Sequence, residues 1–219
     1  MLANVALADR IVLVTGAAGN LGRAVSSAFE REGATVVGFD LETNLLDQAA
    51  LGRAVDRVIS EKKRIDVLCN IAGGFRMGKP VHETTDADWN FLFDVNVRTV
   101  LHTARAVVPH MLKAGGGKIV NVGAFAAQRG AANMGAYTAS KSAVIRITEA
   151  MAAELREKNI NVNCVLPTIL DTPQNRSDMP KADPRRWVAL DDLARTIVFL
   201  ASDEARAIHG ATLPVAGLS

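Results

Sequence analysis

The amino-acid sequence predicts an α/β fold built on one doubly wound parallel sheet with helices on both faces. Short runs rich in Val and Ile alternate along the whole chain with amphipathic stretches of helix length. A glycine-rich turn follows the first of these runs and opens the first helix. The 219 residues, 49% of them hydrophobic, can bury one sizeable core and are too few for two full domains. We therefore expect residues 1–219 to form a single domain.

Six strands are expected, each mostly Val, Ile, Leu or Cys, as suits a strand buried on both faces. They cover residues 10–14, 35–39, 65–69, 118–122, 161–166 and 212–215. Five helices follow or separate these strands, over residues 21–32, 46–62, 86–113, 135–159 and 191–201. Pro109 lies near the end of the third helix and is expected to bend or weaken it.

Two segments depart from this alternation. Residues 42–47 already resemble the end of a further strand leading into a helix, yet a parallel crossover needs about a dozen residues or more. We therefore expect either that this strand is lost or that a helical segment near 41–43 is missing. The second segment, 167–187, contains four prolines and follows the end of a strand. Such a loop is expected to act as a lid over a binding site, and a mobile surface loop is the alternative.

Composition excludes several classes of protein. Charged residues make up 22% of the chain with a net charge of +2, which gives no reason to expect a nucleic-acid or membrane partner. No apolar run reaches the roughly 20 residues of a membrane helix, and residues 1–10 lack the basic start of a signal peptide, so a cytoplasmic protein is expected. Cys69 and Cys164 lie in apolar runs as reduced core thiols. The four histidines lack ligand spacing, so no metal site is predicted.

A glycine motif follows the first strand. Glycines in such a turn allow a tight bend, close approach of a pyrophosphate and tight helix packing. The candidate cofactor-binding residues here are Thr15, Gly16, Gly19, Asn20, Leu21 and Gly22. Asp40 ends the second strand, where its carboxylate can accept hydrogen bonds from an adenosine ribose and repel a 2′-phosphate, which favours NAD over NADP. A plain strand-to-helix turn and a solvated acid are the alternatives.

A second candidate pair is Tyr137 and Lys141, four residues apart at the start of a helix. This spacing puts both side chains on one face, about 6 Å apart along the axis. The ammonium is expected to lower the phenol pKa from its usual value of about 10 and so make a proton donor or acceptor. Such pairs are more often surface neighbours, but Tyr137 is the only tyrosine in the chain.

Together with further motifs, these residues resemble the short-chain dehydrogenase/reductase family from end to end. The further motifs are Asn70-Ile71-Ala72-Gly73 after the third strand, Asn96 in the third helix, residues 167–172 and the closing run 210–217. The resemblance implies a Rossmann-like fold in which NAD exchanges a hydride and Tyr137 a proton. It also implies that Lys141 holds the nicotinamide ribose and that Asn96 supports a proton-relay water.

The same resemblance extends to the cofactor site and to assembly. It implies that Asn70, Ala72 and Gly73 lie along the cofactor, and that Pro167, Ile169 and Thr172 lie near the nicotinamide. It further implies a homodimer or homotetramer formed through helices 86–113 and 135–159. Burial of these helices within one subunit is the alternative.

Three positions depart from the family pattern. Asn20 stands where a glycine is usual, and Thr168 replaces a glycine after Pro167. Ala124 replaces the serine usually found thirteen residues before the tyrosine. A methyl group cannot donate a hydrogen bond to a substrate oxygen.

The dihydropteridine reductases of this family resemble the chain in that alanine and in three runs, 72–75, 135–137 and 165–180. They imply NADH-dependent reduction of a conjugated ring, such as a quinonoid dihydropterin, which needs no serine. Phe75 is a candidate to cover that ring, although a core aromatic is the commoner role. The alternatives are a carbonyl or alcohol oxidoreductase, such as a 3-oxoacyl reductase, that manages without the serine, and a weakly active NAD-binding scaffold.

Overall fold

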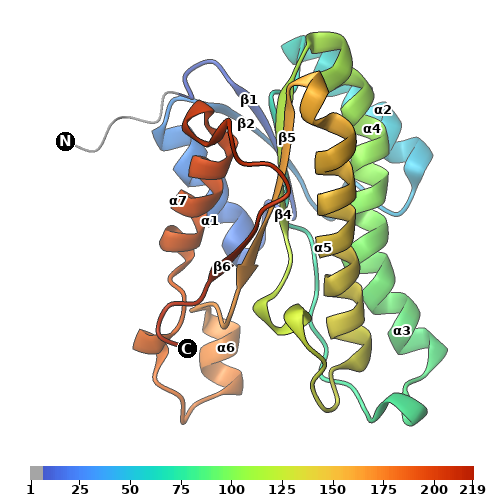
Figure 1. The fold of residues 1–219 in the computed structure, drawn as a ribbon, viewed down its shortest axis with the longest axis vertical. Coiled ribbons are helices and arrows are strands. Elements are labelled where there is room, and N and C mark those ends of the chain that lie inside the picture. Colours follow the sequence, from blue (N-terminus) through green and yellow to red (C-terminus); the bar gives the residue numbers. More distant parts are fainter. Residues whose placement is uncertain (1–6) are drawn as a thin grey trace.

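A computed structural model describes residues 7–219, and these form one parallel six-stranded sheet with helices on both faces (Figure 1). The predicted fold class, a Rossmann-like doubly wound α/β sheet, is confirmed. The strand order is β2-β1-β3-β4-β5-β6, so the order reverses at β1. The expectation that residues 1–10 are no signal peptide falls mostly on residues 1–6, which lie outside the described residues.

The six strands are β1 (Ile11–Thr15), β2 (Thr35–Phe39), β3 (Val67–Asn70), β4 (Gly117–Val122), β5 (Ile160–Pro167) and β6 (Thr212–Val215). The seven helices are α1 (Asn20–Arg31), α2 (Gln48–Lys62), α3 (Asp86–Phe93), α4 (Thr99–Ala114), α5 (Gly135–Leu155), α6 (Pro173–Asp178) and α7 (Leu190–Ala201). The predicted strands all occur, with ends shifted by at most two residues.

Two hydrophobic layers hold the helices to the sheet. Helices α1 and α7 cover one face, and α2, α4 and α5 cover the other (Figure 1). Because side chains alternate along a strand, Val12 and Val14 of β1 enter the first layer while Leu13 between them enters the second. All three are fully buried, which explains why β1 shows no alternation of polar and apolar residues.

The helix predicted over residues 86–113 is interrupted, so that prediction was wrong in detail. Helix α3 ends at Phe93, a single π-helical turn spans Asp94–Arg98, and α4 continues from Thr99. Pro109 lies within α4, which runs on to Ala114 without a break. Such π-helical turns occur frequently at functional sites, and this one carries Asn96.

Residues 40–47 form an irregular loop between β2 and α2, with no strand or helix of their own. The common doubly wound order, 3-2-1-4-5-6, has another strand outside the second one. Here β2 is itself the edge of the sheet, so the further strand is lost, as one of the two expectations held. Leu45 still packs against the core, and Asp47 caps α2 by accepting a hydrogen bond from the Ala50 amide at 2.9 Å.

The segment 167–187 is more ordered than predicted. It contains α6 and a 3₁₀ turn over Pro184–Arg186 beyond the carboxyl end of β5 (Figure 1). Its far end is fixed because Trp187 is only 7% exposed and Val188 pairs with Leu170 in an isolated β-bridge. The lid role of this segment stays a prediction.

Within residues 7–219, none of the helices is long and apolar enough to cross a bilayer. In the same range, no three residues among His, Cys, Asp and Glu gather as a metal-binding group. Cys69 and Cys164 are buried free thiols.

Candidate active site

The site forms at the carboxyl ends of β1, β3 and β4. Thr15 pairs in register with Asn70, and Asn70 with Asn121, so these three strand ends lie side by side. The Thr15 hydroxyl oxygen accepts hydrogen bonds from the amides of Ile71 (3.1 Å) and Ala72 (3.2 Å). Thr15, predicted to bind cofactor, is thus placed between the two loops that leave β1 and β3 and ties them together.

The glycine loop between β1 and α1 has the geometry that its sequence predicts. Gly16 has a φ of +66°, and a Cβ there would lie 2.9 Å from Cα of Ala72. A Cβ on Gly22 would collide with the carbonyl oxygen of Gly16. The N-cap residue of α1 is Gly19, which has no side chain. The amides in the first turn of this helix therefore donate no hydrogen bond to an N-cap side chain.

The remaining predicted residues of this loop have structural partners. Leu21 is buried, while the Asn20 side-chain oxygen accepts a hydrogen bond from Arg23 at 2.9 Å. Asp40 lies beside the loop, where its carboxylate accepts a hydrogen bond from the Ala18 amide at 2.7 Å. The structure therefore brings Asp40 next to the glycine loop across 22 residues of sequence.

Gly73, Asn96 and Lys141 meet at the start of the next loop. A Cβ on Gly73 would lie 3.0 Å from Oδ1 of Asn96 and 3.1 Å from Nζ of Lys141. The amide of Asn96 donates to the Gly74 carbonyl at 3.0 Å, and its oxygen accepts from the Gly74 amide at 2.9 Å. The Lys141 ammonium donates to the Val122 carbonyl at 2.9 Å. The missing side chain of Gly73 thus leaves a cradle edged by an amide and an ammonium group.

Sequence reasoning missed the polar groups that hold this arrangement together. Asn96 also donates to the Ser140 hydroxyl at 3.1 Å, which links the π-helical turn to α5. A second, buried chain of hydrogen bonds joins α4, β3, β4 and α5. It runs from Thr103 to Asn70 (2.7 Å), from Asn70 to Asn121 (2.8 Å) and from Asn121 to Thr148 (2.9 Å). Only the strand-end positions of Asn70 and Asn121 give a signal for it in the sequence.

The pKa expectation for Tyr137 was wrong in direction. Burial raises the pKa of the Tyr137 phenol to about 12. Burial also lowers the pKa of Lys141 to about 8, with the neighbouring Cys164 acting in the opposite sense. The i, i+4 spacing does put both residues on α5, but the ammonium bonds to the Val122 carbonyl, and burial dominates both groups. At neutral pH the phenol is therefore fully protonated.

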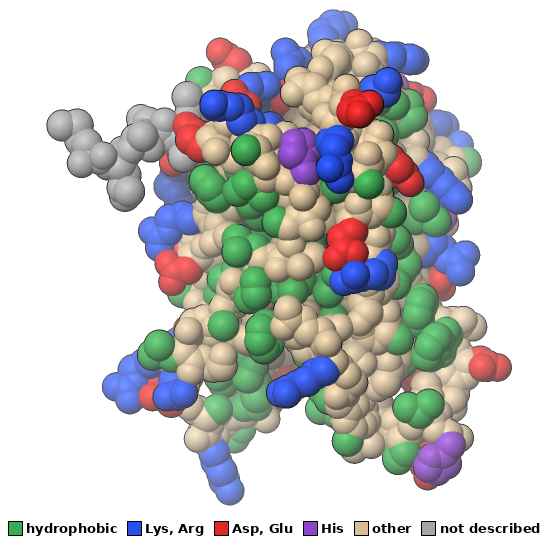
Figure 2. Space-filling view, in the orientation of Figure 1, with side chains coloured by type: hydrophobic (Ala, Val, Ile, Leu, Met, Phe, Trp, Pro, Cys, Tyr) green, Lys and Arg blue, Asp and Glu red, His purple; other side chains and the backbone are tan. Residues whose placement is uncertain are grey.

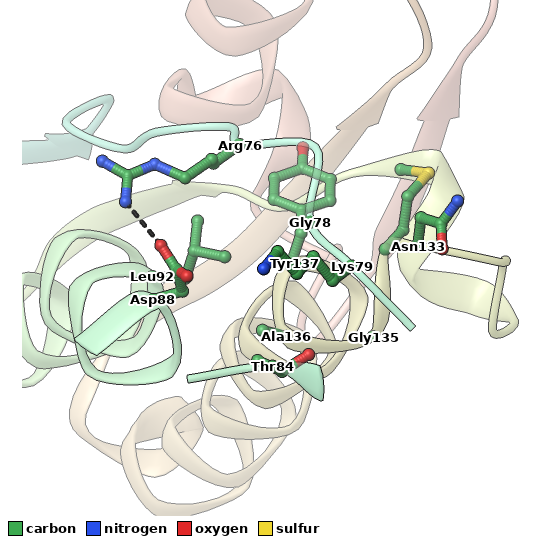
Figure 3. Close-up of a pocket in the computed structure, with 11 residues that line it drawn as sticks. Arg76, Gly78, Lys79, Thr84, Asp88, Leu92, Asn133, Gly135, Ala136 and Tyr137 are labelled. Atoms are coloured by element: carbon green, nitrogen blue, oxygen red, sulfur yellow. Dashed lines mark hydrogen bonds and ion pairs between the residues drawn. The ribbon is translucent and has the colours of Figure 1, made fainter. Parts of the chain in front are cut away.

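A recess opens beside Tyr137 between α3, the first turn of α5 and the loop after β3 (Figure 3). Phe75, in that loop, meets the Tyr137 ring edge to face with the ring centroids 4.9 Å apart. Phe75 is 56% exposed, so it is no core aromatic. The molecular surface is hollowed at the same end of the molecule, between the part that holds α6 and the part that holds α3 (Figure 2).

Ala124 follows β4 and is 5% exposed. It belongs to an apolar cluster that includes Val144, Cys164 and Leu166, and Tyr137 packs against this cluster. The position of the usual serine is thus occupied by a methyl group that belongs to the apolar cluster against which Tyr137 packs.

The three predicted residues of the nicotinamide side follow in order along the chain. Pro167 ends β5, and the Ile169 carbonyl accepts a hydrogen bond from the Val188 amide at 2.9 Å. Thr172 caps α6 by accepting from the Asn175 amide at 3.1 Å. Thr168, the departure from the family pattern, donates to the Ala216 carbonyl at 2.9 Å and so ties this loop to the C-terminal segment.

Comparison with known proteins identifies the family. The profile described as enoyl-(acyl carrier protein) reductase matches residues 16–217. Cyclopentanol dehydrogenase from Comamonas testosteroni is 35% identical over 241 aligned positions, which cover 95% of this chain and 96% of that protein. The chain belongs to the short-chain dehydrogenase/reductase family of oxidoreductases. Another member, 3-oxoacyl-[acyl-carrier-protein] reductase from Thermotoga maritima, is 32% identical to it. That alignment covers 96% of this chain and 98% of the reductase.

Solved structures of short-chain dehydrogenases/reductases agree with this placement. Carveol dehydrogenase from Mycobacterium avium in complex with NAD is 28% identical, with a TM-score of 0.88 over 96% of this chain and 97% of its own. The alignment with cyclopentanol dehydrogenase is longer than this chain of 219 residues, so at least 22 of its positions have no counterpart here.

Proposed function

We propose that the chain binds NAD at the carboxyl edge of the sheet and acts as an NADH-dependent reductase. The residues fit this cofactor in three places. The uncapped first turn of α1 offers amides to a diphosphate, Asp40 lies beside it for a ribose, and the cradle at Gly73 has room that a Cβ would fill. In this proposal Asn70, Ala72 and Gly73 flank the cofactor, with Pro167, Ile169 and Thr172 near its nicotinamide end.

NAD supplies the hydride chemistry, and the protein supplies position and a proton. Lys141, anchored on the Val122 carbonyl, reaches the cradle where a nicotinamide ribose would lie. Asn96 fixes the 73–74 loop to α5 and supports a proton-relay water. Because the Tyr137 phenol is protonated at neutral pH, it is ready to donate a proton, which is the direction that a reduction requires.

We infer that the substrate is a conjugated ring of the quinonoid dihydropterin type, as in dihydropteridine reductases. The observation that carries this inference is the methyl group of Ala124 in the apolar cluster against which Tyr137 packs. No neighbouring hydroxyl on α5 replaces the serine, because Thr138, Ser140 and Ser142 donate to the carbonyls of Met134 (2.9 Å), Tyr137 (2.8 Å) and Ala127 (2.6 Å). Tyr137 is then the one hydroxyl aimed at substrate in this stretch, and exposed Phe75 gives a flat ring something to pack on.

A second candidate is a carbonyl or alcohol oxidoreductase. It is favoured by the relatives, whose names include cyclopentanol dehydrogenase, D-threitol dehydrogenase from Mycolicibacterium smegmatis and 3-oxoacyl-[acyl-carrier-protein] reductase. In that case Tyr137 alone must donate to the developing oxyanion. A weakly active scaffold is the least supported function, because Asn96 and Lys141 meet at one cradle and Tyr137 lies one helical turn before Lys141 on α5. We further propose a homodimer or homotetramer assembled through α4 and α5, located in the cytoplasm.

The substitution Ala124→Ser separates the two enzymatic candidates. A hydroxyl restored there would donate to a developing oxyanion, an interaction worth about 2.7–4 kcal/mol in comparable sites. If ketones are the substrates, their turnover should rise by about 100-fold or more. If a quinonoid dihydropterin is the substrate, turnover should stay level or fall, because the hydroxyl would stand in an apolar cluster.

The assay compares parent and variant side by side on a quinonoid dihydropterin and on cyclopentanone, with NADH in both cases. Ala127→Ser, close to Ala124 in sequence and equally buried, controls for an unspecific effect of a new hydroxyl. A parent that reduces cyclopentanone efficiently and leaves the dihydropterin at its background rate would overturn the ring-substrate proposal.

A further inference from the structure

The recess beside Tyr137 combines an apolar floor with a charged rim. Its floor includes Leu92 and Ala136, which are 2% and 8% exposed. Arg76 and Lys79, from the loop after β3, line the recess together with Asp88 from α3 (Figure 3). This loop also carries Phe75, whose ring meets that of Tyr137. The two cations of the rim therefore belong to the same loop as Phe75, which we propose to contact the substrate.

The single acid of the recess is already satisfied. One carboxylate oxygen of Asp88 accepts from the Arg76 guanidinium at 2.7 Å, and the other accepts from the Thr85 hydroxyl at 2.8 Å. Arg76 also lies over the ring of Phe91, 4.2 Å from its centroid, so its side chain is held in place. Arg76 and Asp88 thus cancel each other's charge within a fixed pair.

Lys79 is left as the surplus cation of the recess. Among residues 7–219 no carboxylate comes within ion-pairing distance of its ammonium group, and the side chain is exposed at the rim. The lining residues carry two positive charges and one negative charge, which leaves a net charge of +1 facing the space next to Tyr137. A cation in this place attracts a ligand with one negative charge.

We propose that the substrate carries a carboxylate, which Lys79 binds at the rim of this recess while the reacting ring lies against Tyr137 and Phe75. This inference rests on the proposed function, because it adds an acid group to the conjugated ring. One surplus charge matches a carboxylate better than a phosphate ester, which carries close to two charges at pH 7. Lys79 is then a specificity-determining residue, and it takes no part in hydride or proton transfer.

The test measures binding of matched acid and neutral ligands by calorimetry. The first pair is pterin-6-carboxylate and 6-methylpterin, and the second is phenylglyoxylate and its methyl ester. The parent should bind the acid of a pair at least about 5-fold more tightly than its neutral partner, and 0.5 M NaCl should reduce this preference. Lys79→Gln should abolish the preference and leave the affinity of the neutral ligand unchanged.

Two variants sharpen the result. Lys62→Gln removes the same charge from the end of α2, at the opposite edge of the sheet, and should keep the preference. Asp88→Asn removes the one acid of the recess and should increase the preference about 2- to 3-fold. Equal binding of acid and neutral ligands by the parent, no binding of any of the four, or a preference that survives Lys79→Gln would each overturn the proposal.

The two ligand pairs separate this inference from the function on which it rests. If neither pterin binds but phenylglyoxylate shows the predicted dependence on Lys79, the carboxylate site stands and the pterin-type substrate is wrong. If both pterins bind equally well, the ring-substrate proposal stands and the carboxylate site is wrong.

Discussion

At the scale of single residues, Tyr137 is the proposed proton donor. We expect Tyr137→Phe to lower turnover at least about 100-fold, because the change removes the proton-transfer group and keeps the ring that packs beside Phe75. NADH affinity should change little, and steady-state kinetics with fluorescence titration of NADH measure both quantities. Near-full activity in this variant would mean that water or another group protonates the substrate.

We expect the buried Lys141 ammonium to lower the free energy of unfolding of the protein. Burial lowers its pKa to about 8, so between this pH and its unfolded value the unfolded chain binds more protons and stability rises with pH. Below pH 8 the ammonium is charged in both states, so the loss of folding stability reaches its full value, on the order of 1–3 kcal/mol.

Lys141→Met should therefore raise the free energy of unfolding at pH 7 by about 1–2 kcal/mol, the lost hydrogen bond to Val122 offsetting the rest. At pH 9.5 the difference between variant and parent should shrink, and activity should be lost at both pH values. Urea unfolding at the two pH values measures this. A variant less stable than the parent at pH 7 would contradict the assignment.

Some features of single residues could be predicted from the sequence, and others depend on tertiary contacts. The spacing of Tyr137 and Lys141 predicts a shared helix face, and the structure has it. The sign of the tyrosine pKa shift depends on how deeply the phenol is buried by α5, β5, the segment after β4 and the loop at Phe75, which come from distant parts of the chain. The pairing of Arg76 with Asp88 depends on the same tertiary arrangement, so no local pattern indicates it.

At the scale of elements, the end of β2 and the glycine loop are expected to select the cofactor. Asp40 should favour NADH over NADPH by about 2–4 kcal/mol, because a 2′-phosphate would lose the ribose hydrogen bonds and meet a carboxylate. In Asp40→Asn the side-chain oxygen can still accept the hydrogen bond from the Ala18 amide. The variant should therefore narrow the difference in affinity between NADH and NADPH without disordering the glycine loop.

Affinities of both cofactors for the parent, Asp40→Asn and Glu61→Gln check this expectation. Glu61 lies in the last turn of α2 and serves as a control for loss of one negative charge. Equal binding of the two cofactors by the parent, or tighter NADPH, would show that the carboxylate at the end of β2 does not select the cofactor.

Short runs rich in Val, Leu or Phe between turn residues are what the sequence predicts best. The strands β2 and β6 occur at the predicted residues, even though both lie at the edges of the sheet and are only partly buried. The π-helical turn at Asp94–Arg98 was missed because one extra residue per turn hardly disturbs the hydrophobic period of a long helix. Helix α6 was missed because its polar sequence has no apolar face, and Pro173 and the Thr172 cap define its start instead.

At the scale of the whole molecule, the chain forms a doubly wound sheet that lacks the strand usually found on the outer side of β2. The loop over residues 40–47 is too short for a parallel crossover, and loss of the strand was one of the two expectations that followed from its length. The residues of the proposed cofactor site belong to strands β1 to β5 and to the segments that follow them. None of these residues would lie on a strand outside β2. The missing strand therefore leaves the strand ends that carry Thr15, Asn70 and Asp40 in place.

We propose that this fold reduces a conjugated ring with NADH through Tyr137 and without a serine hydroxyl. The most direct measurement is the kcat/KM of the parent for NADH oxidation with a quinonoid dihydropterin, compared with its kcat/KM for cyclopentanone and for a β-ketoacyl thioester. We expect the kcat/KM for the dihydropterin to exceed both other values by at least about 100-fold. Efficient reduction of cyclopentanone or the thioester, with the dihydropterin consumed no faster than without enzyme, would show that the ring-substrate proposal is wrong.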